Sequence, residues 1–214
     1  MLSDHVLFDH MRVVAGEVRM VPGPDGSRTM RVVTAGEQET DETTALALAA
    51  RDGDPAAQAG FVRATQAEVW RFTAALVDPG VADDLTQETY LRAFRALDSF
   101  EGRSTVRTWL LGIARRTCAD HLRAVVRRRR LNVRLAAQAA TEAPAPDPAH
   151  RLSGADLLSR LSEERRTAFV LTQVLGLSYA EAAEVESVPV GTIRSRVARA
   201  RDELVTAVAK AQAS

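Results

Sequence analysis

The spacing of apolar residues predicts helices along the middle of the chain. From Asp41 to Arg130 apolar side chains recur every three or four positions, which is the period of an amphipathic helix. The predicted helices cover Thr43–Arg51, Ala56–Val77, Asp83–Leu97 and a last stretch from about Thr105 into the Arg127–Arg130 run. Their expected buried faces include Phe61, Val62, Val69, Trp70, Leu76, Leu85, Tyr90, Ala93, Phe94, Leu97, Val106, Trp109, Leu110, Ile113 and Thr117.

A second helical stretch, Leu152–Gln212, carries the pattern of a helix-turn-helix. A helix capped by Ser162 is predicted to stop at Gly176, and Ser178 with Glu181 forms a capping box for a short helix ending near Glu186. Ser187-Val188-Pro189 then leads into a helix over about Val190–Val208. Its core side holds Ile193, Val197, Ala200 and Leu204, while Ser195, Ala198, Arg199 and Asp202 point away, with Arg194 and Arg196 on the flanks.

The segments outside these helical stretches differ in composition. Glu17–Val33 alternates as a hairpin would, but without partner strands we expect residues 1–40 to be a disordered extension. Residues 131–151 contain Pro144, Pro146 and Pro148, which predict an extended, flexible linker. The expected fold is therefore all-α, with two small helical domains at 41–130 and 152–214 joined by that linker.

Charge is balanced over the chain but not along it. The formal net charge is zero, with 28 basic and 28 acidic residues. Between Arg115 and Arg134, however, the arginines at 115, 116, 123, 127, 128, 129, 130 and 134 are accompanied by one acid, Asp120, which is typical of a phosphate-binding stripe. A solvated helix face is the alternative for this stripe and for the arginines of the last helix.

The residues that chemistry or secretion would need are sparse. Cys118 is the lone cysteine, and the four histidines show no metal-like spacing with it. We therefore expect no disulfide, no metal, no cofactor and no catalytic site. No apolar run approaches a membrane span and the N-terminus lacks a signal-peptide pattern, so a cytoplasmic protein without membrane contact is expected.

Four motifs, in order, resemble the sigma-70 family of bacterial RNA polymerase factors. Ala82–Ala93 (ADDLTQETYLRA) is similar to region 2.2, Ser99–Leu110 to region 2.3 and Leu111–Arg123 to region 2.4. Leu171–Tyr179 followed by PVGTIRSR at Pro189–Arg196 is similar to regions 4.1 and 4.2. Because only regions 2 and 4 are recognisable, the resemblance is to the extracytoplasmic-function (ECF) group. Within this group, the sequence of regions 4.1 and 4.2 is most similar to the actinobacterial sigma-C type.

The resemblance implies a non-catalytic subunit that brings core RNA polymerase to promoters and helps start transcription. It implies core-polymerase contacts, through the clamp, for Asp83, Asp84, Leu85, Gln87, Glu88 and Arg92. It implies −10 DNA contacts for Phe100, Arg103, Ser104, Trp109, Arg115, Arg116 and Arg123. It implies −35 DNA contacts, with the second domain resting on the polymerase flap, for Thr192, Arg194, Ser195, Arg196, Ala198 and Arg199. An anti-sigma factor is a further expected partner.

Two other functions fit the sequence less well. A one-component regulator with a helix-turn-helix would explain the second domain but not Asp83–Arg123. An enzyme would need titratable groups converging on a pocket, and the scattered histidines and single cysteine supply none.

Overall fold

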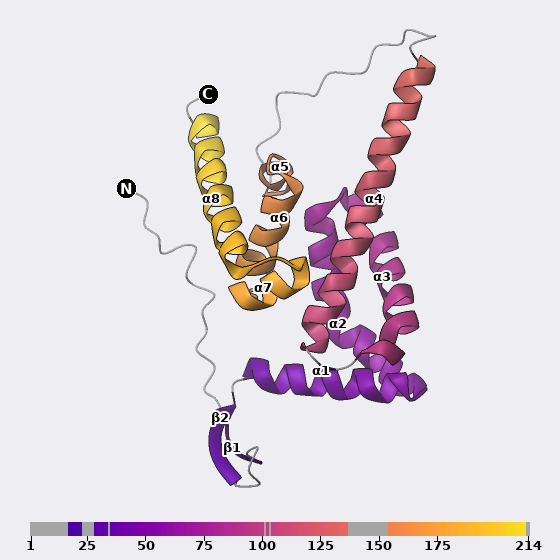
Figure 1. The fold of residues 1–214 in the computed structure, drawn as a ribbon, viewed down its shortest axis with the longest axis vertical. Coiled ribbons are helices and arrows are strands. Elements are labelled where there is room, and N and C mark those ends of the chain that lie inside the picture. The colour runs from indigo at the N-terminus through magenta and orange to yellow at the C-terminus, as the bar shows by residue number, and fades with distance from the viewer. Residues whose placement is uncertain are drawn as a thin grey trace.

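The computed structural model describes residues 17–22, 28–33, 35–100, 102, 104–136 and 154–212, and for 17–22, 28–33, 35–41, 132–136 and 211–212 only the backbone. Apart from one short hairpin, the described part is helical and forms two helical units, α1–α4 and α5–α8 (Figure 1). Within it, no helix combines the length and apolar character needed to cross a membrane. The all-α class predicted from the apolar spacing is confirmed.

The first unit consists of α1 (Ala35–Arg51), α2 (Pro55–Leu76), α3 (Ala82–Ala96) and α4 (Val106–Ala136). Asp54 begins α2, because its carboxylate accepts the backbone N–H of Ala56 at 2.8 Å while Pro55 occupies the first helical position. Asp78 caps the short η2 turn (Pro79–Val81) in the same way, and a further turn, η3 (Leu97–Ser99), follows α3. These local signals set the start of α2 and the start of α3 close to the predicted positions.

An aromatic group fills the centre of this unit. Phe61, fully buried, meets both Tyr90 and Phe94 edge-on with ring centroids 6.3 Å apart, and the Tyr90 hydroxyl lies 2.6 Å from that of Thr65. Burial raises the pKa of Tyr90 to about 12, so its hydroxyl stays protonated. The prediction that Trp70 is a core residue is wrong, because Trp70 is 41% exposed.

The second unit contains α5 (Gly154–Ser159), α6 (Glu163–Phe169), a π-helical continuation η4 (Val170–Val174), α7 (Tyr179–Glu186) and α8 (Val190–Gln212). The predicted capping box is present: Glu181 N–H donates to Ser178 Oγ at 3.2 Å, and Ser178 N–H donates to Glu181 Oε2 at 2.8 Å. Ser187 ends α7 in the left-handed conformation, with φ of 54°. The helix-turn-helix predicted from the sequence is thus formed by α7 and α8.

The flanking segments differ from expectation. Glu17–Pro22 (β1) and Arg28–Val33 (β2) pair antiparallel, with Met20 opposite Met30, and α1 begins at Ala35. The extension therefore holds regular structure before residue 41, because the two antiparallel strands pair their backbone groups with each other. At the other boundary α4 continues to Ala136, into the predicted linker, whose remaining residues, 137–151, lie outside the described part.

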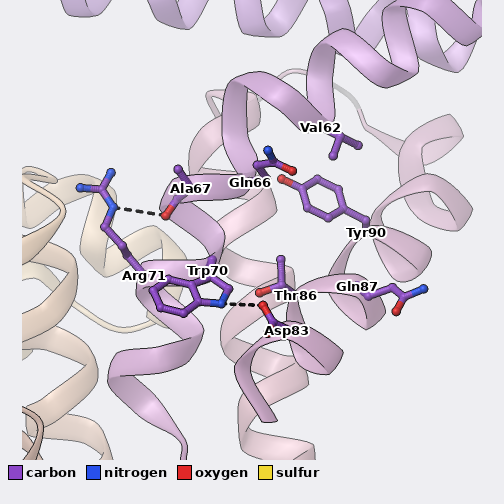
Figure 2. A pocket seen from close by; sticks show the side chains of 9 residues that line it. All are labelled: Val62, Gln66, Ala67, Trp70, Arg71, Asp83, Thr86, Gln87 and Tyr90. Atoms are coloured by element: carbon purple, nitrogen blue, oxygen red, sulfur yellow. Dashed lines mark hydrogen bonds between the residues drawn. The ribbon is translucent and has the colours of Figure 1, made fainter. Parts of the chain in front are cut away.

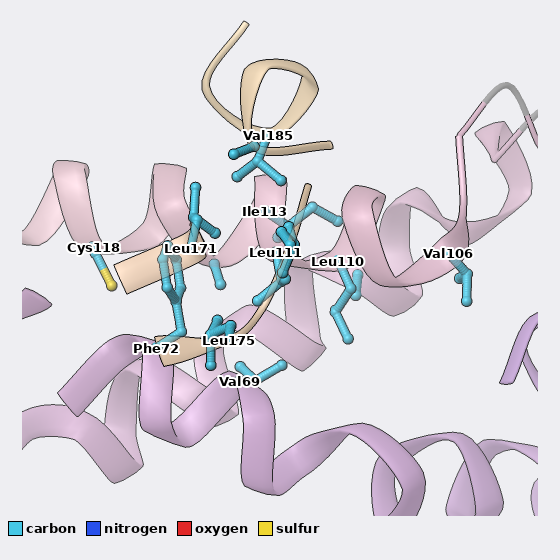
Figure 3. Packing of buried hydrophobic residues seen from close by; sticks show 14 of the residues in the cluster. Val69, Phe72, Val106, Leu110, Leu111, Ile113, Cys118, Leu171, Leu175 and Val185 are labelled. Atoms are coloured by element: carbon cyan, nitrogen blue, oxygen red, sulfur yellow. The ribbon is translucent and has the colours of Figure 1, made fainter. Parts of the chain in front are cut away.

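The two units pack against each other, which the sequence did not predict. Helix α7 lies along α4, and α6 and η4 contact α2, so one hydrophobic cluster runs through both units (Figure 3). Two arginines cross the boundary: Arg107 donates to the Leu175 carbonyl at 2.8 Å, and Arg166 donates to the Leu76 carbonyl at 3.1 Å. We call this packing of α6, η4 and α7 on α2 and α4 the closed arrangement.

Candidate functional site

A network of paired charges joins α3 to α4. Glu88 accepts from Arg92, four residues further along α3, at 2.8 Å, and Arg92 also donates to Asp120 at 2.8 Å. Asp120 accepts a further bond from Arg123 at 2.5 Å. These hydrogen bonds, from Arg92 first and then Arg123, lower the pKa of Asp120. Because the side chains remain well exposed, the network orients them more than it stabilises the fold.

A groove of about 660 Å³ lies on the neighbouring side of α3, against α2 (Figure 2). Trp70 lines it, and its indole N–H donates to Asp83 Oδ1 at 2.8 Å. Gln87 and Tyr90 line the same groove. The proposed polymerase residues therefore divide between two faces: Asp83 and Gln87 face the groove, whereas Glu88 and Arg92 face α4. Leu85 lies on neither, because it is buried in the core at 8% exposure.

The loop before α4 keeps its aromatic residues covered. Phe100 is 6% exposed and packs on half-buried Trp109 with ring centroids 5.2 Å apart. In this arrangement neither ring offers an open face on which a DNA base could stack, although both residues are predicted to contact −10 DNA. Ser104 is half-buried, and Arg103 lies outside the described residues.

The arginine stripe of α4 is open along only part of its length. Arg116 and Arg123 are exposed, as are Arg127–Arg130, whereas Arg115 is half-buried. Leu111 and Ala119, which lie one turn before and one turn after Arg115 on the same side of α4, are only 1% and 5% exposed. This face of α4 is covered because α7 packs on it. Nearby Cys118 is also buried, and burial raises the pKa of its thiol to about 12.

The outer face of α8 is open to solvent as predicted. Arg194, Ser195, Ala198 and Arg199 are exposed and Thr192 is half-buried, while Ile193, Val197 and Ala200 anchor the opposite side at 1% exposure or less. Arg196 differs from its neighbours on the helix, because its guanidinium is drawn back into an ion pair with Glu186 at the end of α7. Four of the six proposed −35 residues thus form one exposed patch.

Glu186 is a buried acid that the sequence did not reveal. Its side chain has no exposed surface, and burial raises its pKa to about 6 although Arg196 and Arg115 oppose the shift. Glutamate at the end of a short helix usually faces solvent, so no local signal marks it.

Arg107, Arg166 and Trp70 were likewise missed as contact residues, because their partners are distant in sequence. In the described part, no cluster of three or more His, Cys, Asp or Glu could hold a metal ion.

The chain is similar to known proteins of one family. The family model "Sigma-70 region 2" matches residues 61–129, and "Sigma-70, region 4" matches residues 155–204. The ECF RNA polymerase sigma factor SigC of Mycobacterium tuberculosis is 49% identical over 179 residues, covering 81% of this chain and 95% of the relative. An ECF RNA polymerase sigma-E factor of Haemophilus influenzae is 34% identical, covering 78% of this chain and 94% of the relative.

Solved structures agree on the fold. CnrH in complex with the cytosolic domain of CnrY matches with a TM-score of 0.60 and 25% identity, covering 79% of this chain and 99% of that one. The sigma factor RpoE in complex with the anti-sigma factor NepR, from Bartonella quintana, matches with a TM-score of 0.52 and 30% identity, covering 67% and 91%. With both region models matched in order, the chain belongs to the sigma-70 family of RNA polymerase sigma factors, in the ECF group and of the sigma-C type.

Proposed function

We propose that this sigma factor carries core RNA polymerase to specific promoters through two separate surfaces and has no catalytic site of its own. The observation that carries the proposal is the open arginine face of a correctly capped helix-turn-helix on one unit, combined with exposed, paired charges on α3 of the other. The arginine face of α8 suits a DNA groove, where arginine can bind guanine edges or phosphates. The paired charges of α3 suit a charged protein partner.

On this proposal the α3 residues Asp83, Asp84, Gln87, Glu88 and Arg92 bind the polymerase clamp. The arginines of α4, with the Phe100–Trp109 pair, contact −10 DNA, and the outer face of α8 reads −35 DNA while the second unit rests on the flap. The protein acts in the cytoplasm, with the polymerase. An anti-sigma factor is a further partner, by analogy with the relatives crystallised with theirs.

The closed arrangement has a consequence for this mechanism. The second unit covers Leu111, Ala119 and part of Arg115, and the ring of Phe100 packs on that of Trp109 at the start of α4. We infer that the two units separate before both reach promoter DNA. Binding of each unit to its own surface on the polymerase supplies the free energy for that separation.

Transcription with core polymerase tests the proposal directly. Run-off transcription from a genomic promoter library should start at defined promoters only when the chain is added to core polymerase. The isolated chain should bind the same DNA weakly. Tight, sequence-specific binding by the isolated chain, without any transcript on addition of core polymerase, would instead favour a one-component regulator.

Replacing the exposed arginines of α8 should change base preference. If Arg194 or Arg199 hydrogen-bonds a guanine edge, Arg194→Ala or Arg199→Ala should weaken the free energy of promoter binding by about 1–3 kcal/mol and relax base preference at one −35 position.

Arg123, which is paired with Asp120 on α4, is expected to hold phosphate. Arg123→Ala should therefore weaken all promoters evenly and lower the salt slope by about one.

The measurement is open-complex formation on a panel of promoter variants at several salt concentrations. Arg201→Ala, which removes an exposed arginine further along α8 that bonds Gln173, is the matched control. If Arg194→Ala and Arg199→Ala leave base preference unchanged while Arg123→Ala alters −35 preference, the roles assigned to the two units are wrong.

Limited proteolysis should cut first between Ala139 and Ala149. The alternating prolines of this segment disfavour helix, and unstructured chain is cut before packed helices. Two resistant fragments should remain, and they should elute together under native conditions because the closed arrangement joins the units. A first cut within Asp83–Arg123, read from fragment masses, would contradict this organisation.

A further inference from the structure

The carboxylate of Glu186 is buried where the two units meet. Oε2 accepts from Arg196, whereas Oε1 has no hydrogen-bond partner although it is inaccessible. A buried carboxylate with an unsatisfied oxygen is costly when ionised, and protonation removes most of that cost. No step of promoter recognition proposed above uses Glu186 directly.

Charged groups from every helix around it act on Glu186. Arg196 of α8 and Arg115 of α4 favour its charged form, while Glu163 and Glu164 at the start of α6 disfavour it. Loss of hydration outweighs all of these influences. Both units therefore contribute to the environment of Glu186: α6 and α8 belong to the second unit, and Arg115 belongs to the first.

The first unit contributes to covering this position. Helix α7 packs against α4, and Val185, the residue before Glu186, is 4% exposed, with its side chain between α7 and α4 (Figure 3). When the units separate, the α4 side of α7 is returned to water. Glu186 would then be hydrated from that side and would keep Arg196 while it loses Arg115. Because burial is the largest influence on its pKa, the gain in hydration outweighs the loss of Arg115 and favours the carboxylate.

We propose that Glu186 makes the closed arrangement proton-dependent, so that acid holds the two units together and alkali releases them. The consequence for promoter binding rests on the proposed function, but the switch itself is a property of the isolated chain.

The direction follows from the pKa of Glu186 in the two forms. Burial raises that pKa to about 6 in the closed form, from an ordinary value of 4.5. Closing therefore takes up a proton. The population of the closed form increases as the pH falls through about 6 and decreases as the pH rises again. Between about pH 7 and pH 5 the ratio of closed to open molecules should rise by up to about tenfold, the limit for a carboxylate that is fully hydrated in the open form.

Distance measurement on the full chain tests the switch. Donor and acceptor dyes are placed by Ala59→Cys on α2 and Ala209→Cys on α8, both exposed alanines, in a Cys118→Ala background. Energy transfer is followed from pH 8 to pH 5, with circular dichroism to verify that helicity is constant. We expect transfer to be constant above about pH 7 and to rise as the pH falls through about 6.

Two variants on α7 separate Glu186 from general acid effects. Glu186→Gln is a neutral isostere and should give high transfer with no dependence on pH. Glu184→Gln makes the same change at an exposed position of the same helix and should behave like the unaltered chain. Constant transfer in the unaltered chain, or an unchanged pH dependence in Glu186→Gln, would overturn the proposal. Transcription assays at fixed pH test the proposed function independently, so the two can fail separately.

Discussion

Reversing both charges in the variant Asp84→Arg/Glu88→Arg is expected to weaken binding to core polymerase on the order of 100-fold. Both acids lie on the exposed part of α3, and Glu88 orients Arg92 at 2.8 Å. A partner surface complementary to these acids would meet like charge after the reversal, at a cost of about 3 kcal/mol. The fold should tolerate the change, because Arg92 keeps its bond to Asp120 and neither acid is buried.

Co-purification with core polymerase and fluorescence titration measure this effect. Asp52→Arg reverses an exposed acid in the turn between α1 and α2 and is the matched control, expected to leave affinity unchanged. Circular dichroism should be unaltered in both variants. Undiminished affinity of a folded double variant would show that this face of α3 does not bind polymerase.

Placing a charge in the contact between α7 and α4 should open the closed arrangement. Val185 is 4% exposed there, and Val185→Asp would bury a carboxylate without a partner, at a cost of about 3 kcal/mol. Separation of the units hydrates that carboxylate, so the ratio of closed to open molecules should fall on the order of 100-fold. The radius of gyration from small-angle X-ray scattering should increase accordingly.

Opening must be distinguished from unfolding of the second unit. Ala119→Glu places the charge on the α4 side of the same contact, where Ala119 is 5% exposed, and should increase the radius of gyration in the same way. Val205→Asp, at a position 69% exposed on α8, should leave the radius unchanged. Lost helicity in Val185→Asp, with a compact Ala119→Glu variant, would mean that Val185 supports the second unit alone.

Local signals in the sequence were sufficient for the helices and for the DNA-facing patch. Apolar spacing placed α2, α3, α4 and α8 within a few residues, except for the far end of α4, and the Ser178–Glu181 capping box fixed the turn before α7. Because Ile193 and Val197 define the core side of α8, the exposure of Arg194 and Arg199 followed from the helical period. Family resemblance then supplied the roles of these surfaces.

The closed arrangement could not be predicted in this way, because it depends on which distant surfaces meet. The covered side of α4 carries Gly112 and Ala119 beside Leu111 and the half-buried Arg115, a mixture of small, apolar and charged residues that does not stand out as a buried face in the apolar pattern. Trp70 has the apolar spacing of a core residue, but its indole N–H binds Asp83 of another helix. Glu186 ends its helix as an ordinary acid does. Its burial, its unpaired oxygen and its raised pKa arise when α4, α6 and α8 surround it, since desolvation and charge–charge interactions depend on position in space and not on position in the chain.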